Sequence, residues 1–239
     1  MENSVTFVPK QIVSLPGAKQ SPFDVRLITT KEERHAVFVL RRRAYAEYIE
    51  QDASPPDGEY RDAFDDLATT ILLGAFDEGR LVGAMRLCFS GVWDCLSTLP
   101  CAEYYPALVP IKRAAAGSLM EVSRFSIDPD ISNTSYRTTL YASLVRASLM
   151  AAEAADVARI LIGTQPEWVR FYKYMLGFDL IGEPAIYPPG DIRIALLGGS
   201  LAQARLRQRL QNKFFRISDD EIESMRRILG PVLDGMQAA

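Results

Sequence analysis

The amino-acid sequence predicts a single α/β sandwich around a mixed, mainly antiparallel β-sheet. The first observation is composition, because 48% hydrophobic and 24% charged residues over a length of 239 are typical of a globular protein with a sizeable core. The second is the order of the patterns, in which strand-like segments of period two alternate with longer segments of a period of about 3.6. No internal repeat interrupts this order. The two observations favour one layered domain.

The first half of the chain is expected to form an arm, a strand, a long helix and a pair of strands. Thr30 and Glu33 form a capping box that predicts a helix N-terminus. Asp77, Glu78 and Gly79 predict a turn between the paired strands. The expected ranges are 1–22 for an extended arm, 23–28 for a strand, about 31–50 for the helix, 51–66 for a polar, acidic loop, and 71–75 and 80–87 for the paired strands.

The second half is expected to add the rest of the sheet and its covering helices. Gly177 predicts the end of a short helix. The expected ranges are 99–110 for an irregular connection, 119–127, 159–163, 178–181 and 192–197 for strands, and about 135–156 and 167–175 for helices.

Residues 200–239 are expected to form a C-terminal helical extension. Ser218 and Glu221 form a second capping box, and Gly230 with Pro231 predicts the end of the last helix. The segment before this helix is basic and carries no acidic residue among Arg205, Arg207, Arg209, Lys213 and Arg216.

Charge and cysteine content exclude several classes of protein. A net charge of −3 argues against a chain whose main partner is nucleic acid. The single histidine, His35, excludes most histidine-based zinc sites, and no metal is expected. Cys88, Cys95 and Cys101 are interpreted as cytosolic thiols. With no apolar segment near the roughly 20 residues of a membrane helix and no signal sequence, a cytoplasmic protein without a membrane span is expected.

Arginines in two expected elements require acidic partners. Arg41, Arg42 and Arg43 are adjacent in the first helix, where successive side chains point about 100° apart. At least one of them must lie near the apolar face, and a buried guanidinium needs a carboxylate. Arg86 lies inside an otherwise apolar strand and needs an acid too. The candidate partners of Arg86 are Asp62, Asp65 and Glu121.

Glu121 lies in the strand segment Met120–Phe125. Period two predicts that Glu121, Ser123 and Phe125 share one face of this strand, with Val122 and Arg124 on the other. One interpretation of Glu121 is a structural ion pair. The other is a general base whose pKa is set by partial burial against nearby arginines.

The order of these motifs resembles a known family. The motifs are similar to those of acyl-homoserine-lactone synthases and, more closely, of N-acyl amino acid synthases, which are acyl-carrier-protein-dependent members of the GCN5-related N-acetyltransferase (GNAT) superfamily. The resemblance covers about residues 24–197, and it implies a GNAT-like α/β/α sandwich with an acyltransferase domain over 23–199. The matching motifs are Arg41-x-x-x-Tyr45, Asp62-x-x-Asp65, Gly83-x-x-Arg86-Leu87 and Glu121-x-Ser123-Arg124-Phe125, followed by an aromatic helix at Trp168–Tyr172 before Gly177-Phe178.

The resemblance implies that the protein transfers a fatty acyl group to the amine of an amino acid or similar acceptor. No tightly bound cofactor is implied. A backbone N–H at 123–125 would stabilise the charge that develops on the thioester carbonyl. By the resemblance, Glu121 would accept the proton, Arg124 would be its partner, and Arg86 would belong to the same electrostatic cluster. Ser123 and Phe125 would bind substrate, and Arg41 and Tyr45 would shape the acceptor end of the site. Asp62 and Asp65 would either hold the amine or brace the arginines.

The expected donor is acyl-phosphopantetheine, carried by acyl carrier protein or by CoA. Acetyl-CoA enzymes of the superfamily cradle pyrophosphate in a glycine-containing turn. The segment 128–137 has no glycine, and Asp128 and Asp130 would repel phosphate, so the carrier protein is favoured. The basic segment 202–216, extended by Arg137, Arg146 and Arg170, would offer the acidic carrier protein a docking surface.

Two alternatives remain open. One is a lactone synthase using S-adenosylmethionine, which is disfavoured because Glu50, Gln51 and Asp52 stand where lactone synthases usually have a Trp. The other is a non-catalytic module that binds acyl chains or a carrier protein. A catalytic protein would gather Arg86, Glu121 and an aspartate of the 62–66 loop around one cleft. It would also have an apolar tunnel beside Phe125, between strands 119–127 and 159–163.

Overall fold

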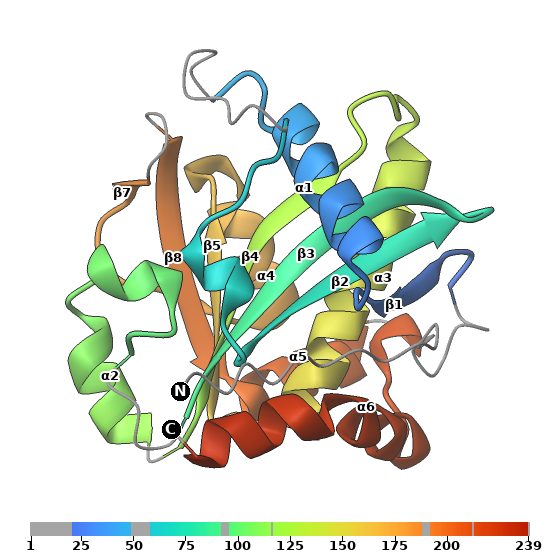
Figure 1. The fold of residues 1–239 in the computed structure, drawn as a ribbon. Helices are drawn as coiled ribbons and strands as arrows, with labels where there is room; N and C mark the ends of the chain where they lie inside the picture. Colours follow the sequence, from blue (N-terminus) through green and yellow to red (C-terminus); the bar gives the residue numbers. More distant parts are fainter. Residues whose placement is uncertain are drawn as a thin grey trace, which may run out of the picture.

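The computed structural model describes residues 21–48, 58–91, 96–115, 117–187, 192–211 and 213–238. Eight strands form one sheet in the order β1-β2-β3-β4-β5-β8-β6, and β7 pairs with β8 (Figure 1). Among the described strands, only β4 and β5 run parallel, so the expected mixed, mainly antiparallel sheet is confirmed. The strands are β1 (Asp24–Leu27), β2 (Thr70–Asp77), β3 (Arg80–Ser90), β4 (Leu119–Ile127), β5 (Arg159–Thr164), β6 (Asp179–Leu180), β7 (Ala185–Tyr187) and β8 (Ile192–Ser200).

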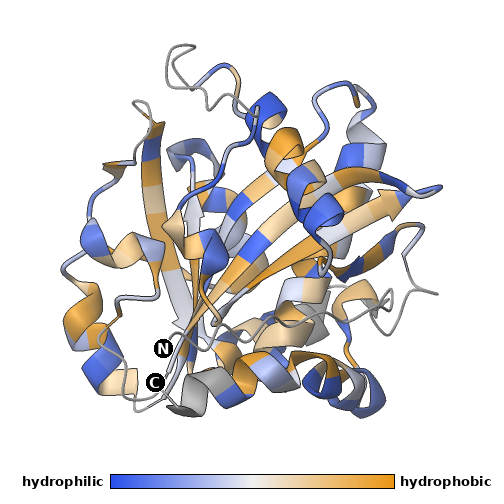
Figure 2. Ribbon diagram, viewed as in Figure 1, coloured by the Kyte–Doolittle hydropathy of each residue, from blue (hydrophilic) through white to orange (hydrophobic). Residues whose placement is uncertain are grey.

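Helices cover both faces of this sheet (Figure 1). On one face, Leu140 and Leu144 pack with Leu73 and Met85 of the strands in the main core. On the other face, helix α1 packs a smaller core against β2 and β3. Hydrophobic residues follow the central strands in Figure 2, as this arrangement requires. The helices are α1 (Lys31–Ala44), α2 (Leu108–Ala115), α3 (Thr134–Ala154), α4 (Val169–Leu176), α5 (Leu201–Gln211) and α6 (Asp219–Ala238), with short 3₁₀ turns η3 (Ala63–Asp66), η4 (Pro100–Glu103), η5 (Pro166–Trp168) and η6 (Lys213–Phe215).

Local signals place most element boundaries correctly. Glu33 donates its N–H to the Thr30 hydroxyl and Thr30 donates its N–H to the Glu33 carboxylate, so the expected capping box begins α1. Gly177 adopts the left-handed conformation (φ 70°) that ends α4. Helix α1 ends at Ala44 rather than near 50, and the connection expected to be irregular contains η4 and α2. Strand β7 was not expected.

A β-bulge in β4 reverses part of the expected face pattern. Arg86 faces Ser123 and Ala84 faces Ser126, so Arg124 and Phe125 together oppose one residue of β3. Arg124 takes a positive φ of 53° at this point. Its guanidinium therefore lies on the same side of the sheet as Arg86, with which it shares Asp62 as a partner. The phenyl ring of Phe125 packs against Tyr141 of α3 on the opposite side.

The helices after β8 complete the main core. Met225 and Leu229 of α6 are fully buried against α3. The α6 capping box is confirmed by the hydrogen bonds between Ser218 and Glu221. The expectation that Pro231 ends this helix is wrong, because α6 continues to Ala238. Burial of the apolar residues on both sides of Pro231 offsets the hydrogen bond that proline removes.

The expected basic docking surface is also partly wrong. Arg146 is 4% exposed and donates to the Glu221 carboxylate at 2.7 Å, so it is a core ion pair. Arg137 donates to the Ile131 carbonyl, and Arg205 pairs with Glu153.

Some residues named in the sequence analysis lie outside the described part of the chain. They are residues 1–20 and 49–57, Cys95, and the side chains of Arg209 and Lys213. Within that part, no helix is long and apolar enough to cross a membrane.

Candidate active site

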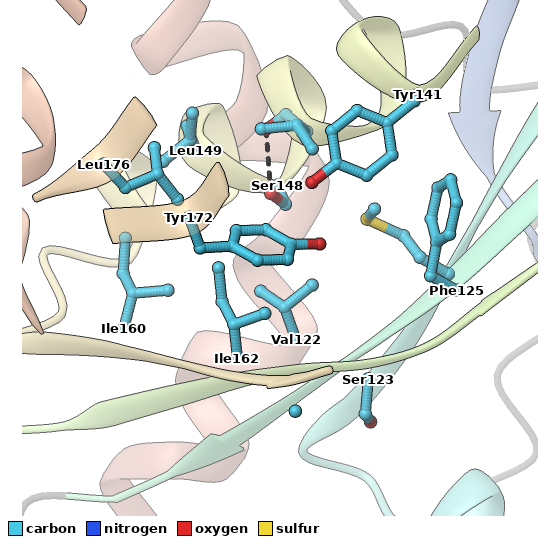
Figure 3. A pocket seen from close by; sticks show the side chains of 13 residues that line it. Val122, Ser123, Phe125, Tyr141, Ser148, Leu149, Ile160, Ile162, Tyr172 and Leu176 are labelled. Carbon is cyan, nitrogen blue, oxygen red and sulfur yellow. Dashed lines mark hydrogen bonds between the residues drawn. The ribbon is translucent and has the colours of Figure 1, made fainter. Parts of the chain in front are cut away.

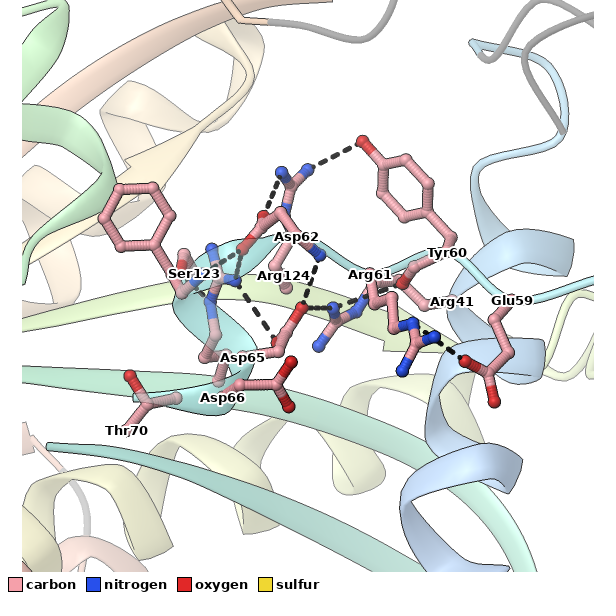
Figure 4. Close-up of polar contacts among 12 residues, drawn as sticks. Arg41, Glu59, Tyr60, Arg61, Asp62, Asp65, Asp66, Thr70, Ser123 and Arg124 are labelled. Carbon is pink, nitrogen blue, oxygen red and sulfur yellow. Dashed lines mark hydrogen bonds and ion pairs between the residues drawn. The ribbon is translucent and has the colours of Figure 1, made fainter. Parts of the chain in front are cut away.

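Arginines and aspartates from four segments form one connected network on the face of the sheet that α1 covers (Figure 4). Arg41 comes from α1, Asp62 and Asp65 from the η3 turn, Arg86 from β3 and Arg124 from β4. Both acids lie on one side of η3 because they are three residues apart and cap the same turn. The expectation that Arg86 and at least one of the three adjacent arginines meet carboxylates is confirmed, and the buried arginine of the three is Arg41.

Asp65 forms the buried centre of the network. Its side chain and that of Arg41 are both 0% exposed, and Arg41 donates to it at 2.8 Å. The Arg86 guanidinium lies 3.2 Å from the same carboxylate. Burial lowers the pKa of Arg41, although attraction to Asp65 opposes this effect. Asp65 therefore braces two arginines and has no open side for a substrate.

Asp62 lies at the solvent-exposed edge of the network. Its carboxylate accepts from Arg86 at 2.6 Å and from Arg124 at 2.8 Å, and its side chain is 28% exposed. Burial alone would raise the pKa of Asp62, but the two arginines outweigh burial and lower this pKa to about 2. Asp62 is thus ionised at neutral pH and holds the two guanidinium groups together.

Two tyrosines connect α1 and the neighbouring loop to the bulge in β4. The Tyr45 hydroxyl donates to the Phe125 carbonyl at 2.7 Å. Arg124 donates to the Tyr60 hydroxyl at 2.9 Å, and its guanidinium lies 4.9 Å from the centroid of the Tyr60 ring. Tyr60 was not expected at the site, because no local pattern distinguishes it from other loop tyrosines.

Glu121 lies beside this network and beneath η4. Its side chain is 1% exposed and its Oε2 accepts the Cys101 N–H at 2.9 Å. Burial raises the pKa of Glu121, while the Cys101 hydrogen bonds and the arginines Arg86 and Arg124 oppose the increase. The carboxylate is therefore close to the positive charge but shielded from bulk water.

An apolar pocket opens on the opposite face of the sheet (Figure 3). It is narrow, with a cavity volume of about 20 Å³. Of the residues expected to line a tunnel, Val122 does so, whereas Met120, Leu140, Leu144 and Leu161 are fully buried core residues. The lining residues are Met85, Val122, Ser123, Phe125, Tyr141, Val145, Ser148, Leu149, Ile160, Ile162, Gly163, Tyr172 and Leu176.

The pocket and the charged network meet at the bulge. Ser123 lines the pocket, and its hydroxyl accepts from the Arg86 guanidinium of the network at 3.3 Å. Pairing between β4 and β5 stops at Val122 and Ile162, after which β5 continues along β8. Regular pairing of the two parallel strands thus ends next to Ser123.

Sequence reasoning missed part of this site. Tyr141 lines the pocket and was not expected there, whereas Tyr172, which also lines it, belongs to the aromatic helix of the sequence motif. Cys101 was interpreted only as a thiol, although its backbone N–H binds Glu121. The Cys88 and Cys101 thiols are buried, and burial raises the pKa of Cys88 to about 12. Among the described residues, no cluster of three acidic, histidine or cysteine side chains could hold a metal ion.

Comparisons with known proteins agree with this geometry. The family model described as N-acyl amino acid synthase FeeM matches residues 36–199. The structure of FeeM, an N-acyl amino acid synthase from uncultured soil microbes, superposes with a TM-score of 0.62 and 21% identity, over 77% of this chain and 92% of that chain. A comparison with curated protein sequences finds no match.

Two further solved structures have the same fold. BjaI, a CoA-dependent acyl-homoserine lactone synthase solved with S-adenosylmethionine and isopentyl-CoA, has a TM-score of 0.52 and 18% identity, over 86% of this chain and 92% of that chain. An acyl-CoA N-acyltransferase from Pseudomonas aeruginosa has a TM-score of 0.50 and 19% identity, over 74% of this chain and 99% of that chain. The expected GNAT-like fold is confirmed.

Proposed function

The chain belongs to the FeeM family of N-acyl amino acid synthases, and we propose that it transfers a fatty acyl group from acyl carrier protein to the amine of an amino acid or similar acceptor. N-acyl transfer from a thioester is the activity of such enzymes. The donor, the acceptor and the residue roles are the substance of the proposal. We also propose a cytoplasmic location, because Cys88 and Cys101 are free thiols and cysteines stay reduced in the cytoplasm.

The observation that carries the proposal is the junction at Ser123. The apolar pocket proposed to receive the acyl chain lies on one side of β4, and a charged network suited to a polar acceptor lies on the other. A thioester carbonyl placed where the pairing of β4 and β5 ends would lie between the two. Such a site brings two reactants together, which by itself lowers the barrier of a two-substrate reaction.

In the proposed reaction, the neutral amine nitrogen of the acceptor attacks the thioester carbonyl carbon. The C–N bond forms and the C–S bond breaks, so the products are an amide and the thiolate of the donor, which becomes a thiol when it takes up the proton that the amine has lost. Glu121 accepts the proton that the nitrogen loses, through an intervening water because only 1% of this residue is exposed. The backbone at 123–125 supplies an N–H group to the charge that develops on the carbonyl oxygen.

The network favours an acceptor with a carboxylate. At its exposed edge, Arg86 and Arg124 share the single carboxylate of Asp62, so positive charge is in excess at this edge. The Arg124 side chain is 17% exposed and presents this charge to solvent. An amino acid carboxylate would be attracted there, whereas the sulfonium of S-adenosylmethionine would be repelled.

The connection between β4 and α3 favours a carrier-protein donor over CoA. Asp128 is buried and pairs with Arg43 and Arg80, and Asp130 also pairs with Arg43. The Asn133 side chain caps the first turn of α3. Two carboxylates and a filled cap oppose the pyrophosphate of CoA, whereas phosphopantetheine on a protein brings a single phosphate.

A basic surface on α4 and α5 fits such a carrier protein. Arg170 and Lys173 are exposed on α4, the helix whose inner side lines the pocket. Arg207 of α5 packs beside Gly177 at the end of α4 and is exposed as well. Tyr174, 67% exposed, adds an apolar contact. This basic surface, made of Arg170, Lys173, Tyr174 and Arg207, complements a small acidic protein.

The direct test is product analysis by mass spectrometry. The purified protein is incubated with acyl carrier protein or CoA thioesters of one fatty acid, together with either an amino acid mixture or S-adenosylmethionine. We expect N-acyl amino acids, formed faster from the carrier protein. An acyl lactone as the main product would identify a lactone synthase, and equal rates from CoA would refute the carrier-protein preference.

A further inference from the structure

The Glu121 carboxylate is bound by a residue that none of the sequence motifs includes. Its Oε2 accepts the backbone N–H of Cys101 at 2.9 Å, and the Cys101 thiol also donates a hydrogen bond to this carboxylate. Both residues are buried, with exposures of 1% for Glu121 and 0% for Cys101. Cys101 lies in η4, whose N-cap residue, Leu99, supplies no side-chain hydrogen bond. The carboxylate from β4 takes the place of that cap and joins η4 to the sheet.

The other titratable groups around Glu121 leave this role to Cys101. Cys88 lies opposite Glu121 in the register of β3 and β4, but its thiol accepts from the Thr70 hydroxyl at 3.3 Å. Burial, followed by the charge of Glu121, raises the pKa of Tyr187 on β7, so this phenol stays neutral. The groups that act on Glu121 through their charge are Arg86 on β3 and Arg124 on β4. Among the described residues, Cys101 therefore supplies the hydrogen bonds that Glu121 receives.

The two hydrogen bonds oppose the effect of burial on Glu121. Burial raises the pKa of this carboxyl, and the hydrogen bonds from Cys101 lower it more than the charge of either Arg86 or Arg124 does. Donors that bind a carboxylate favour its ionised form. A proton acceptor must be ionised before the reaction, so these donors keep Glu121 in the form that can act. Two donors on one residue also restrict the rotation of the carboxylate.

We propose that Cys101 is a positioning residue for the acyl transfer, and that its N–H and thiol keep the Glu121 carboxylate ionised and oriented towards the acceptor. The inference rests on the proposed function and adds a residue that acts through Glu121 rather than on either substrate. Burial and the neighbouring carboxylate raise the pKa of the Cys101 thiol well above its ordinary value. Cys101 therefore stays protonated and acts as a hydrogen-bond donor, not as a nucleophile.

The test compares the pH–rate profiles of matched cysteine variants. The wild-type kcat should rise with pH as Glu121 loses its proton. Cys101→Ala removes the thiol donor and keeps the N–H, so we expect this rise to occur about one pH unit higher, the effect of losing one hydrogen bond to a charged group. Cys101→Ser supplies a hydroxyl donor and should restore a profile close to that of the wild type.

The matched control is Cys88→Ala. It removes the same thiol from the same buried cluster, but a thiol whose partner is Thr70. A merely structural role of the two thiols would lower stability in both alanine variants and move neither pH profile. The inference is overturned if Cys101→Ala has the wild-type profile, or if Cys88→Ala shifts the profile equally.

Infrared titration provides a readout that does not depend on turnover. The protonated Glu121 carboxyl has a C=O stretching band that Glu121→Gln lacks, and the midpoint pH of this band is measured without substrate. We expect a midpoint about one pH unit higher in Cys101→Ala than in the wild type and in Cys88→Ala. An unchanged midpoint would overturn the inference.

The two readouts separate the inference from the proposed function. If the wild type forms no amide product from any thioester, the proposed function fails, and the infrared midpoint still decides whether Cys101 keeps Glu121 ionised. If amide forms but neither the profile nor the midpoint moves in Cys101→Ala, only the inference about Cys101 fails.

Discussion

At the scale of single residues, exposure divides the charged network into two parts. Arg41 and Asp65 are inaccessible and hold the remaining groups in place. Asp62 and Arg124 reach solvent at the edge and are available to a substrate. Glu121 is shielded from water, and its pKa is raised by burial. This division predicts different consequences for substitutions at chemically similar side chains.

Replacing Glu121 with glutamine should reduce kcat by a factor of roughly 10² to 10⁴. The amide is nearly isosteric and uncharged, so the free energy of unfolding should not decrease. A base must be deprotonated to act, and the wild-type rate should therefore rise with pH through the raised pKa of Glu121. Glu121→Gln should lack this limb of the pH–rate profile.

The matched control is Glu103→Gln, on the exposed side of the same η4 turn. It should leave both the rate and the pH profile unchanged. Near-wild-type kcat in Glu121→Gln would instead assign the proton to another group, such as Asp62.

Asp62→Asn should destabilise the protein at neutral pH but not in strong acid. The native pKa of Asp62 is about 2, below the ordinary value of 3.8. A depressed carboxyl pKa contributes stability above about pH 4, which is lost as the pH falls towards 2. The shift corresponds to about 2 kcal/mol at pH 7, measurable by denaturant unfolding at several pH values. Asp66→Asn, at a side chain 67% exposed, should cost far less.

At the scale of elements, β4 contributes to both the charged network and the apolar pocket, because the alternation of its side chains between the two faces of the sheet is interrupted once, at the bulge. Up to Val122 the strand pairs regularly with β3 and β5. At Arg124 the bulge turns one further side chain towards the network and sends Phe125 to the pocket side. Tyr45 holds the bulge from α1 through the Phe125 carbonyl. One strand therefore supplies groups to both the charged face and the apolar pocket.

The junction of α3 and α6 yields a stability prediction. Glu221 caps the first turn of α6 and accepts from the buried Arg146 guanidinium at 2.7 Å. Glu221→Ala leaves this guanidinium without its carboxylate and should lower the free energy of unfolding by about 3–5 kcal/mol. Glu223 lies two residues further along α6, in an exposed pair with Arg226. Glu223→Ala should lower the free energy of unfolding by less than about 1 kcal/mol. Equal losses in the two variants would contradict the interpretation of Arg146 as a core residue.

At the scale of the whole molecule, the proposed docking of a carrier protein should depend on charge. Reversing Arg170 and Arg207 to glutamate should raise the KM for the carrier-bound donor several-fold and leave kcat unchanged. Added salt should have a similar effect on the wild type, because it screens the attraction between exposed charges. Steady-state kinetics over a range of salt concentrations measures both effects.

Two controls separate docking from other causes. A pantetheine thioester needs no carrier protein, so its KM should be the same in the wild type and the variant. Arg227→Glu, on the exposed side of α6, should not change the KM for the carrier protein. An equal loss with the pantetheine thioester would show that the basic surface is not the docking site.

Several features of this protein could be predicted from the sequence alone, because they depend on neighbours in the chain or on a single strong energetic demand. The capping box at Thr30 and the left-handed Gly177 arise within one turn of helix. Arg86 in an apolar strand had to meet an acid, since an unpaired buried charge is too costly, and it meets Asp62 and Asp65. The motifs likewise indicated the correct family.

Only the tertiary structure decided how these residues are distributed between the two faces of the sheet. Strict alternation predicted the wrong side for Phe125, because a bulge arises from pairing with β3 and not from β4 itself. Arg146 was expected on the surface, but burial depends on contacts with α6, far away in the chain. Turns, helix caps and hydrophobic periodicity are determined by residues within a short segment. The burial of a side chain depends instead on contacts with residues far away in the chain, which only the fold brings together.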